Sequence, residues 1–299
     1  MYPRFAYRGR VLPSRCVALE STLLLHGVPA EAAMELAERL DQDVISQGAL
    51  PATVAVVSGE PVVGLSREEL GTLLRAGRVP KANSGNLLPL ISRRSHAATT
   101  VSTTMQLAAM AGLRVFATGA LGGVHPGFGT SADVSADLPA FTRFPVAVVT
   151  AGVKGILDVP ATREVLETLG VTVVGFRCDQ FPAFYRRQAD GFDLPVDVRI
   201  DDVAELARFA ESALARTGRG LVIANPIAAE HELARGQWEA WLASARARVE
   251  AAGVTGRGVT PALLGALHEL SGGATLRANI ELVRSNARLA AQIAAALPA

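Results

Sequence analysis

The sequence predicts a three-layer α/β/α protein with a central mixed, largely parallel sheet. Hydrophobic residues make up 49% of the chain but aromatic residues only 5%. This composition suits a parallel sheet buried between helices better than an all-β sandwich. Short apolar runs alternate with helical patterns along most of the 299 residues, which is typical of βαβ units. No low-complexity linker or repeat divides the chain, so we expect one domain over residues 1–299.

The first hundred residues contain the signals that make this sheet mixed. The expected elements are strands at 17–22, 52–57 and 62–64 and a helix at 29–45. The turn Ser58-Gly59-Glu60-Pro61 separates two strand-like runs and predicts a hairpin, whose antiparallel pair would enter an otherwise parallel sheet. Ser66 and Glu69 have the spacing of a capping box and predict a further helix.

The rest of the chain continues the alternation of strands and helices. The expected strands are 114–118, 146–150, 171–177 and 221–224. The expected helices are 99–111, 162–169 and a helix capped by Asp201 that runs to 214. From 229 onward the pattern is helical, with breaks near 253–258 and at 272–273.

Polar residues follow several of these expected strands directly. Glu20, Lys154, Asn225 and the glycine-rich loop 119–127 all fall at strand ends. Because ligands bind beyond the carboxyl ends of strands in open parallel sheets, we expect a functional site at this edge.

Lys154 lies in the most informative stretch of the chain, residues 144–155. A buried β-branched run ends there in a turn that contains Gly152, Lys154 and Gly155. Burial disfavours the ammonium form of a lysine, and a neutral amine is a nucleophile for carbonyl carbon. Lys154 is therefore a candidate Schiff-base lysine, with a solvated loop lysine as the alternative.

Two further charged residues are candidates for the same site. Glu20 ends a buried run, so we expect its carboxyl to be partly desolvated and suited to acid–base chemistry; capping a neighbouring helix is the alternative. Lys81 follows Pro80 and would neutralise a phosphate or be an ordinary surface lysine.

The glycine-rich loop after Thr118 favours anion binding through backbone N–H groups, or else a tight turn. It lacks the spacing of a dinucleotide-binding motif, and the chain has no P-loop. His125 in this loop would contact a phosphate or cap the loop. Asp133 and Asp137 are four residues apart and would bind a divalent cation if helical, or else cap a helix.

Asn279 and Asn286 lie two helical turns apart, on one face of the expected last helix. Asparagines in such a stripe would hydrogen-bond a polar ring or satisfy loop carbonyls.

Bulk properties exclude several classes of protein. The formal net charge is +1, which gives no electrostatic reason to expect a nucleic-acid partner. Cys16 and Cys178 are far apart and form no disulfide or zinc pattern. The N-terminus lacks a signal-peptide core and no apolar run is long enough to span a membrane, so we expect a cytoplasmic protein without a membrane partner.

A set of ordered motifs links these observations. They are Ala18–Thr22 with His26-Gly27, Pro51–Thr53, Ala98–Ser102, Val115–Gly119, Gly122–His125, Val134–Leu138, Ala151–Asp158, Phe181–Tyr185, Ala224–Ile227 and Asn286–Ala290. Over nearly the whole chain they resemble the pseudouridine-5′-phosphate glycosidases, also called the indigoidine synthase A-like family.

The resemblance implies reversible cleavage or formation of a C–C bond between ribose C1′ and a carbon of uracil. It implies a Schiff base on Lys154 with ring-opened ribose 5-phosphate, acid–base catalysis by Glu20, and a divalent metal, usually manganese, held partly through water by Asp137. Thr118, Lys81 and His125 become candidate substrate-binding residues around the sugar phosphate.

The resemblance further implies that an asparagine of the last helix faces the base, with Asn286 favoured over Asn279. It also implies a homotrimer.

The chain departs from the family pattern where charges are expected. Ala82-Asn83-Ser84-Gly85-Asn86 replaces a run of the Ser-Arg-Arg-Asp type, Pro126 replaces a basic residue, and Gln180 replaces an acidic one. An alternative is therefore a C-ribosyltransferase that attaches ribose 5-phosphate to an aromatic aglycone, as in antibiotic pathways. A non-catalytic sugar-phosphate-binding module is the alternative from another class.

Overall fold

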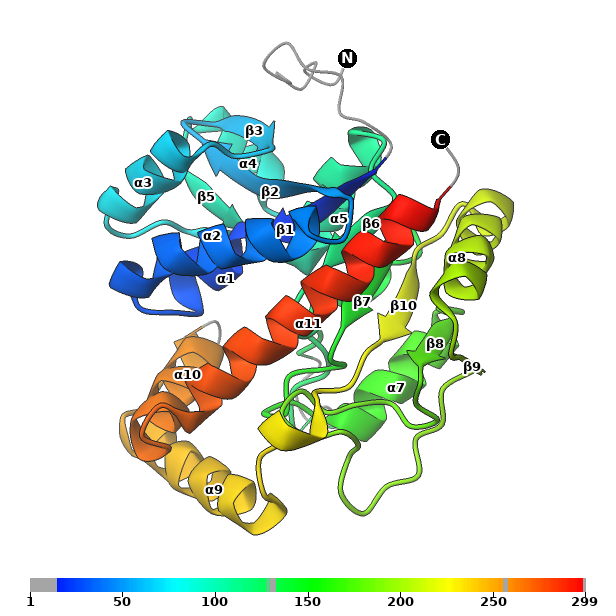
Figure 1. Ribbon diagram of the computed structural model, residues 1–299. Helices are drawn as coiled ribbons and strands as arrows, with labels where there is room; N and C mark the ends of the chain where they lie inside the picture. Colours follow the sequence, from blue (N-terminus) through cyan, green and yellow to red (C-terminus); the bar gives the residue numbers. More distant parts are fainter. Residues whose placement is uncertain (1–14, 128, 130–132, 255–257, 298–299) are drawn as a thin grey trace.

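A long, mostly parallel sheet runs through the middle of the computed structural model (Figure 1), which describes residues 15–127, 129, 133–254 and 258–297. The strand order is β4-β5-β2-β1-β6-β7-β10-β8-β9, and β3 pairs with β2. The strands are β1 (Cys16–Glu20), β2 (Leu50–Val57), β3 (Glu60–Val63), β4 (Lys81–Ala82), β5 (Ala97–Thr99), β6 (Val115–Ala117), β7 (Ala147–Thr150), β8 (Val173–Phe176), β9 (Val198–Ile200) and β10 (Leu221–Ala224).

The sheet is mixed at one end only. The β2–β3 hairpin and the β2–β5 pair are antiparallel, whereas β1 pairs in parallel with both β2 and β6. Strands β6, β7, β10, β8 and β9 continue in parallel. The predicted hairpin is confirmed. Ser58 and Gly59 have φ values of 52° and 81°, as a tight turn matched to the twist of the strands requires.

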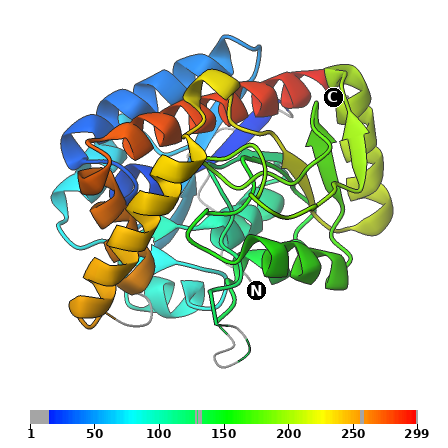
Figure 2. The ribbon, with the colours of Figure 1, turned by 90° about the horizontal axis from the view of Figure 1, so that it is seen from below.

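Helices cover both faces of the sheet. They are α1 (Ser21–His26), α2 (Ala30–Ile45), α3 (Arg67–Arg75), α4 (Leu87–Ser92), α5 (Val101–Met110), α6 (Asp137–Ala140), α7 (Val159–Thr168), α8 (Val203–Thr217), the 3₁₀ turn η1 (Ala229–His231), α9 (Arg235–Ala251), α10 (Val259–Leu270) and α11 (Ala274–Ala296). Figures 1 and 2 show α2, α8 and α11 on one face and α5 and α7 on the other, so the predicted three layers are confirmed.

The core is the sheet itself and the helix faces that pack on it. All four residues of β7 and of β10 are buried, because helices cover both sides of a parallel sheet and its strands become continuous apolar runs. α9 and α10 extend beyond the edge at which β7 and β10 end (Figure 1).

Several predicted boundaries are wrong for local reasons. The strand expected at 17–22 ends at Glu20, because Ser21 already begins α1. The helix expected from 99 begins at Val101, after a three-residue strand. Asp202, not Asp201, accepts the capping bond of α8, since Asp201 is paired with Arg199.

The capping box of Ser66 and Glu69 is confirmed at the start of α3. Within the described part of the chain, no helix combines the length and the apolar character needed to cross a bilayer.

Candidate active site

A cavity of about 230 Å³ lies where the sheet edge faces α10. Glu20, Lys81, Gly119 and Lys154 line its sheet side. The wall opposite comes from helices near the C-terminus and includes Thr260, Pro261, Leu264, Gly265, His268 and Asn279. Glu20 and Lys154 were predicted at this edge, and the structure places both of them on one cavity.

Glu20 is the carboxyl group of this cavity. It ends β1, and the hydroxyl of Thr118, at the end of the neighbouring β6, donates a hydrogen bond to its Oε1. Burial raises the pKa of Glu20 above its ordinary value, while the charge of Lys154 and the Thr118 hydrogen bond oppose this increase. A carboxyl of this kind keeps its proton to a higher pH than an exposed glutamate, which suits acid–base chemistry.

Lys81 reaches the same cavity from a strand that runs the other way. β4 is parallel to β5, and β5 is antiparallel to β2, so the first residue of β4 lies toward the edge where β1 ends. The segment that departs from the family pattern holds it there, since the Asn86 amide donates to the Lys81 carbonyl (3.1 Å) and accepts from the Asn83 N–H (2.7 Å). Burial lowers the pKa of Lys81, and the nearby charge of Lys154 lowers it further.

Lys154 lies in the turn after β7 and is partly buried. Its N–H donates to Leu121 in the neighbouring loop (3.1 Å), and its carbonyl accepts from Leu157 (2.9 Å). Gly152 makes this turn possible: its φ is +87°, and a Cβ there would lie 1.7 Å from the Pro182 carbonyl oxygen. The backbone around Lys154 is therefore tightly determined.

Thr118 and Asp137 make hydrogen bonds that hold residues and loops around the cavity in place. Thr118 is buried and contributes its hydroxyl to Glu20. The Asp137 carboxylate accepts from the backbone N–H of Ser102 (3.0 Å) and of Gly122 (2.9 Å). Asp137 begins α6 and Asp133 lies outside any helix, so the two carboxylates do not share a helical face as one interpretation expected.

The contacts of Asp137 leave room for a metal held partly through water. Each of its carboxylate oxygens accepts one backbone N–H bond and keeps a second lone pair, although among the described residues no group of three His, Cys, Asp or Glu side chains is arranged to hold a metal ion. The manganese expected at Asp137 therefore stays a prediction, and no step of the chemistry below depends on it.

His125 does not line this cavity within the described residues. Its backbone N–H pairs with the Asp133 carbonyl (3.0 Å) in a small antiparallel bridge. Its predicted contact with a sugar phosphate stays a prediction.

The two asparagines of α11 differ in position. Asn286 is fully buried, donates to the carbonyl of Thr118 (2.7 Å) and accepts from Asn225 (2.8 Å). Its amide thus satisfies loop carbonyls, as one interpretation expected, and the preference for Asn286 as the residue facing the base stays a prediction. Asn279 lines the cavity instead.

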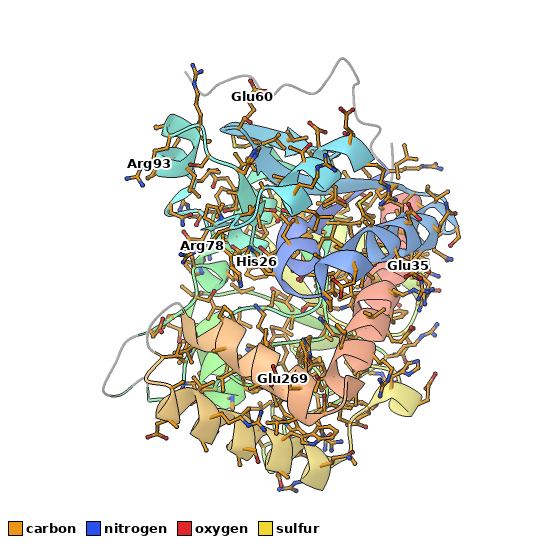
Figure 3. All side chains as sticks on the ribbon, turned by 90° about the vertical axis from the view of Figure 1, so that its left-hand side faces the viewer. His26, Glu35, Glu60, Arg78, Arg93 and Glu269 are labelled. Carbon is orange, nitrogen blue, oxygen red and sulfur yellow. The ribbon has the colours of Figure 1, made fainter. Side chains whose placement is uncertain are left out.

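Sequence reasoning missed the wall opposite the lysines. His268 and Tyr185 line the cavity, and so does His26 at the end of α1. His26 lies beside the segment that leads into β4 (Figure 3). His26 and Tyr185 lie in motifs of the sequence but were given no role there, and His268 had no signal, because nothing local reveals which face of α10 turns toward the sheet.

The fold and site define a class: an α/β protein with a buried carboxyl and two lysine amines on one cavity at the carboxyl edge of its sheet. The chain belongs to the indigoidine synthase A-like family. The model of that family, described as "Indigoidine synthase A like protein", matches residues 13–296.

Named relatives agree with this membership. The chain is 46% identical over 282 residues to a pseudouridine-5′-phosphate glycosidase of Dinoroseobacter shibae, covering 94% of this chain and 92% of the relative. It is 45% identical to the enzyme of the same name from Deinococcus radiodurans, over 93% of this chain and 88% of the relative.

Two solved structures share the fold. The prealnumycin C-glycosynthase AlnA, in complex with ribulose 5-phosphate, matches with a TM-score of 0.85 and 35% identity, over 94% of this chain and 91% of that one. An indigoidine synthase A-like protein from Thermotoga maritima matches with a TM-score of 0.85 and 34% identity, over 97% and 98%.

Proposed function

We propose that this protein cleaves or forms the C–C bond between C1′ of ribose 5-phosphate and a ring carbon of an acceptor, with pseudouridine 5′-phosphate as the substrate of the cleavage direction. The observation that carries the proposal is the convergence of Glu20, Lys81 and Lys154 on one cavity. The names of the relatives, pseudouridine-5′-phosphate glycosidase and C-glycosynthase, support the same bond.

A C-glycoside needs an unusual catalyst because its leaving group has no heteroatom to protonate at the bond that breaks. In the cleavage direction, the Glu20 carboxyl donates its proton to the ring oxygen as the C1′–O4′ bond breaks, and the amine of Lys154 bonds to C1′. The raised pKa of Glu20 suits this donation, since it keeps the acid form available at higher pH.

Bond cleavage then uses the lysine nitrogen as the source of electrons. The ammonium formed when Lys154 bonds to C1′ gives a proton to the Glu20 carboxylate, and Glu20 passes it to the ring carbon of the base. The lone pair of the Lys154 nitrogen then forms a C1′=N iminium, and the electron pair of the C1′–C bond goes to the ring. Water hydrolyses the iminium to free Lys154 and the aldehyde of ribose 5-phosphate, and Glu20 recovers a proton from that water. The synthetic direction reverses these steps.

Lys81 serves as the second cation of the cavity. A phosphorylated open-chain sugar is anionic, and its phosphate pairs with the Lys81 ammonium; burial lowers the pKa of Lys81 in the empty cavity, and a bound anion favours its charged form. Binding energy from the phosphate end thereby orients C1′ for attack.

Turnover of pseudouridine 5′-phosphate is the direct test. The wild-type protein should release uracil and ribose 5-phosphate, and Lys154→Ala should lower kcat by about 10³-fold or more, because the covalent route is lost. Uracil release by Lys154→Ala at the wild-type rate would refute the assignment.

A second candidate activity is C-ribosylation of an aromatic aglycone. The structural match to AlnA and the uncharged wall of Pro261, Leu264 and Gly265 favour it. Incubation with ribose 5-phosphate and either uracil or a hydroxynaphthoquinone separates the two. A product with the quinone alone would replace the glycosidase assignment.

A further inference from the structure

The wall of the cavity opposite the lysines carries an oriented histidine that the chemistry above does not use. His268 lies on α10 and lines the cavity together with Pro261, Leu264 and Gly265. α10 lies beyond the sheet edge (Figure 1), so this wall faces the reacting groups from the other side.

A short chain of hydroxyl groups holds the His268 ring. Its Nδ1 lies 2.7 Å from Thr275 Oγ1, and that oxygen lies 3.0 Å from Ser271 Oγ. Thr275 is fully buried, and its N–H donates to Ser271 Oγ (3.2 Å). Because Nδ1 is hydrogen-bonded to Thr275, it is not available to a ligand, and the bond restricts rotation of the ring.

The second ring nitrogen, Nε2, is available to bind a ligand in the cavity. None of the hydrogen bonds found among the described residues involves His268 Nε2. Burial lowers the pKa of His268, so near neutral pH the imidazole is uncharged and Nε2 can make one hydrogen bond, as donor or acceptor according to the tautomer.

The surroundings of His268 suit a flat, uncharged ring rather than a phosphate. Its neighbours on the wall are Pro261, Leu264 and Gly265, whereas both lysines lie on the sheet side. A Cβ placed at Gly265 would meet no atom within 4 Å, so there is open space over this part of α10. Both lysines and Glu20 thus lie on the sheet side of the cavity, and the α10 side carries no lysine, arginine or carboxylate among the described residues.

We propose that the α10 wall binds the acceptor ring and that His268 Nε2 recognises a polar atom at its edge. The acceptor is then a planar ring with a carbonyl oxygen, hydroxyl or ring N–H pointing at α10, while its reacting carbon faces C1′ on Lys154. This inference rests on the proposed function and makes His268 a residue that determines acceptor affinity.

Steady-state kinetics of synthesis test the inference, with ribose 5-phosphate and whichever of uracil or hydroxynaphthoquinone the wild type uses. His268→Ala should raise KM for the acceptor about tenfold, the effect of losing one hydrogen bond. KM for ribose 5-phosphate and borohydride trapping at Lys154 should stay as in the wild type. His231→Ala, on η1 outside the cavity, is the control.

Gly265→Leu gives an independent variant, because it fills the open space without removing the Thr275 contact. It should also raise KM for the acceptor and spare the Lys154 adduct. An unchanged acceptor KM in both variants, in an enzyme that turns over, would overturn this inference alone. Absence of product from the wild type with either acceptor would overturn the proposed function as well.

Discussion

Glu20 is the residue whose surroundings matter most for proton transfer. Burial raises its pKa, and the hydroxyl of Thr118 is the one neutral group that donates to its carboxylate among the described residues. A hydrogen bond to the charged form lowers a pKa, so Thr118 limits how far burial can raise it. At the residue scale, the balance between burial and one hydroxyl thus tunes the catalytic acid.

Thr118→Val should therefore move the pH dependence of catalysis. Loss of the hydroxyl raises the pKa of Glu20 further, so the alkaline limb of the kcat/KM profile for pseudouridine 5′-phosphate should shift upward by about one pH unit. The rate falls on that limb because deprotonated Glu20 cannot donate to the ring oxygen. A pH profile with an unmoved or lower alkaline limb would contradict the assignment of Glu20 as the acid.

Asn279 and Asn286 form a matched pair on one helix. Asn286→Ala should lower the free energy of unfolding by about 2 kcal/mol, because it removes the side-chain donor to the buried Thr118 carbonyl and one of the two acceptors of the Asn225 amide, which keeps only Ser285. Asn279→Ala should leave stability nearly unchanged and weaken binding in the cavity. Denaturant titrations beside kinetics check both, and the opposite pattern would reverse the roles assigned here.

The turn between β7 and α7 is the element on which the site depends most. Gly152 packs against Pro182, and Gly155 lies against Trp238 of α9, where an added Cβ would lie 3.0 Å from the indole. Arg246 of α9 also donates to the Ile156 carbonyl (3.4 Å). One turn therefore positions Lys154 and anchors the helix pair that closes the cavity.

Gly152→Ala should destabilise the protein by about 3 kcal/mol or more, because a Cβ meets both a left-handed φ and a backbone oxygen. Gly218→Ala is the control. It has a left-handed φ of +62° at the end of α8 but open space around it, so it should cost about 1 kcal/mol. Equal losses in chemical denaturation would show that the contact with Pro182 contributes nothing.

At the scale of the whole molecule, strand direction brings the reacting groups together. Glu20 and Lys154 follow parallel strands, so their meeting at one edge could be predicted from the sequence. Lys81 reaches that edge only because β4 is reversed, and a two-residue strand has no periodicity to reveal it. The His268 wall depends on how α10 packs over the edge, which no local pattern encodes.

Asp137 joins parts of the chain that are distant in sequence, α5 and the loop after β6. Asp137→Asn should lower the free energy of unfolding by about 1–3 kcal/mol, because the amide nitrogen cannot accept one of the two backbone N–H bonds. Thermal melts with manganese and with EDTA test the predicted metal in the same experiment. Stabilisation by manganese in the wild type but not in the variant would place a metal on this carboxylate, and equal melts in both would leave Asp137 a structural residue alone.

The central claim is that the Lys154 amine bonds to C1′ of the opened sugar. The most direct measurement is borohydride reduction in the presence of ribose 5-phosphate, followed by mass spectrometry of the peptides. We predict one reduced pentose-phosphate adduct on the peptide that contains Lys154 and none in Lys154→Ala. An adduct on Lys81 instead, or no adduct in an enzyme that releases uracil, would contradict the account.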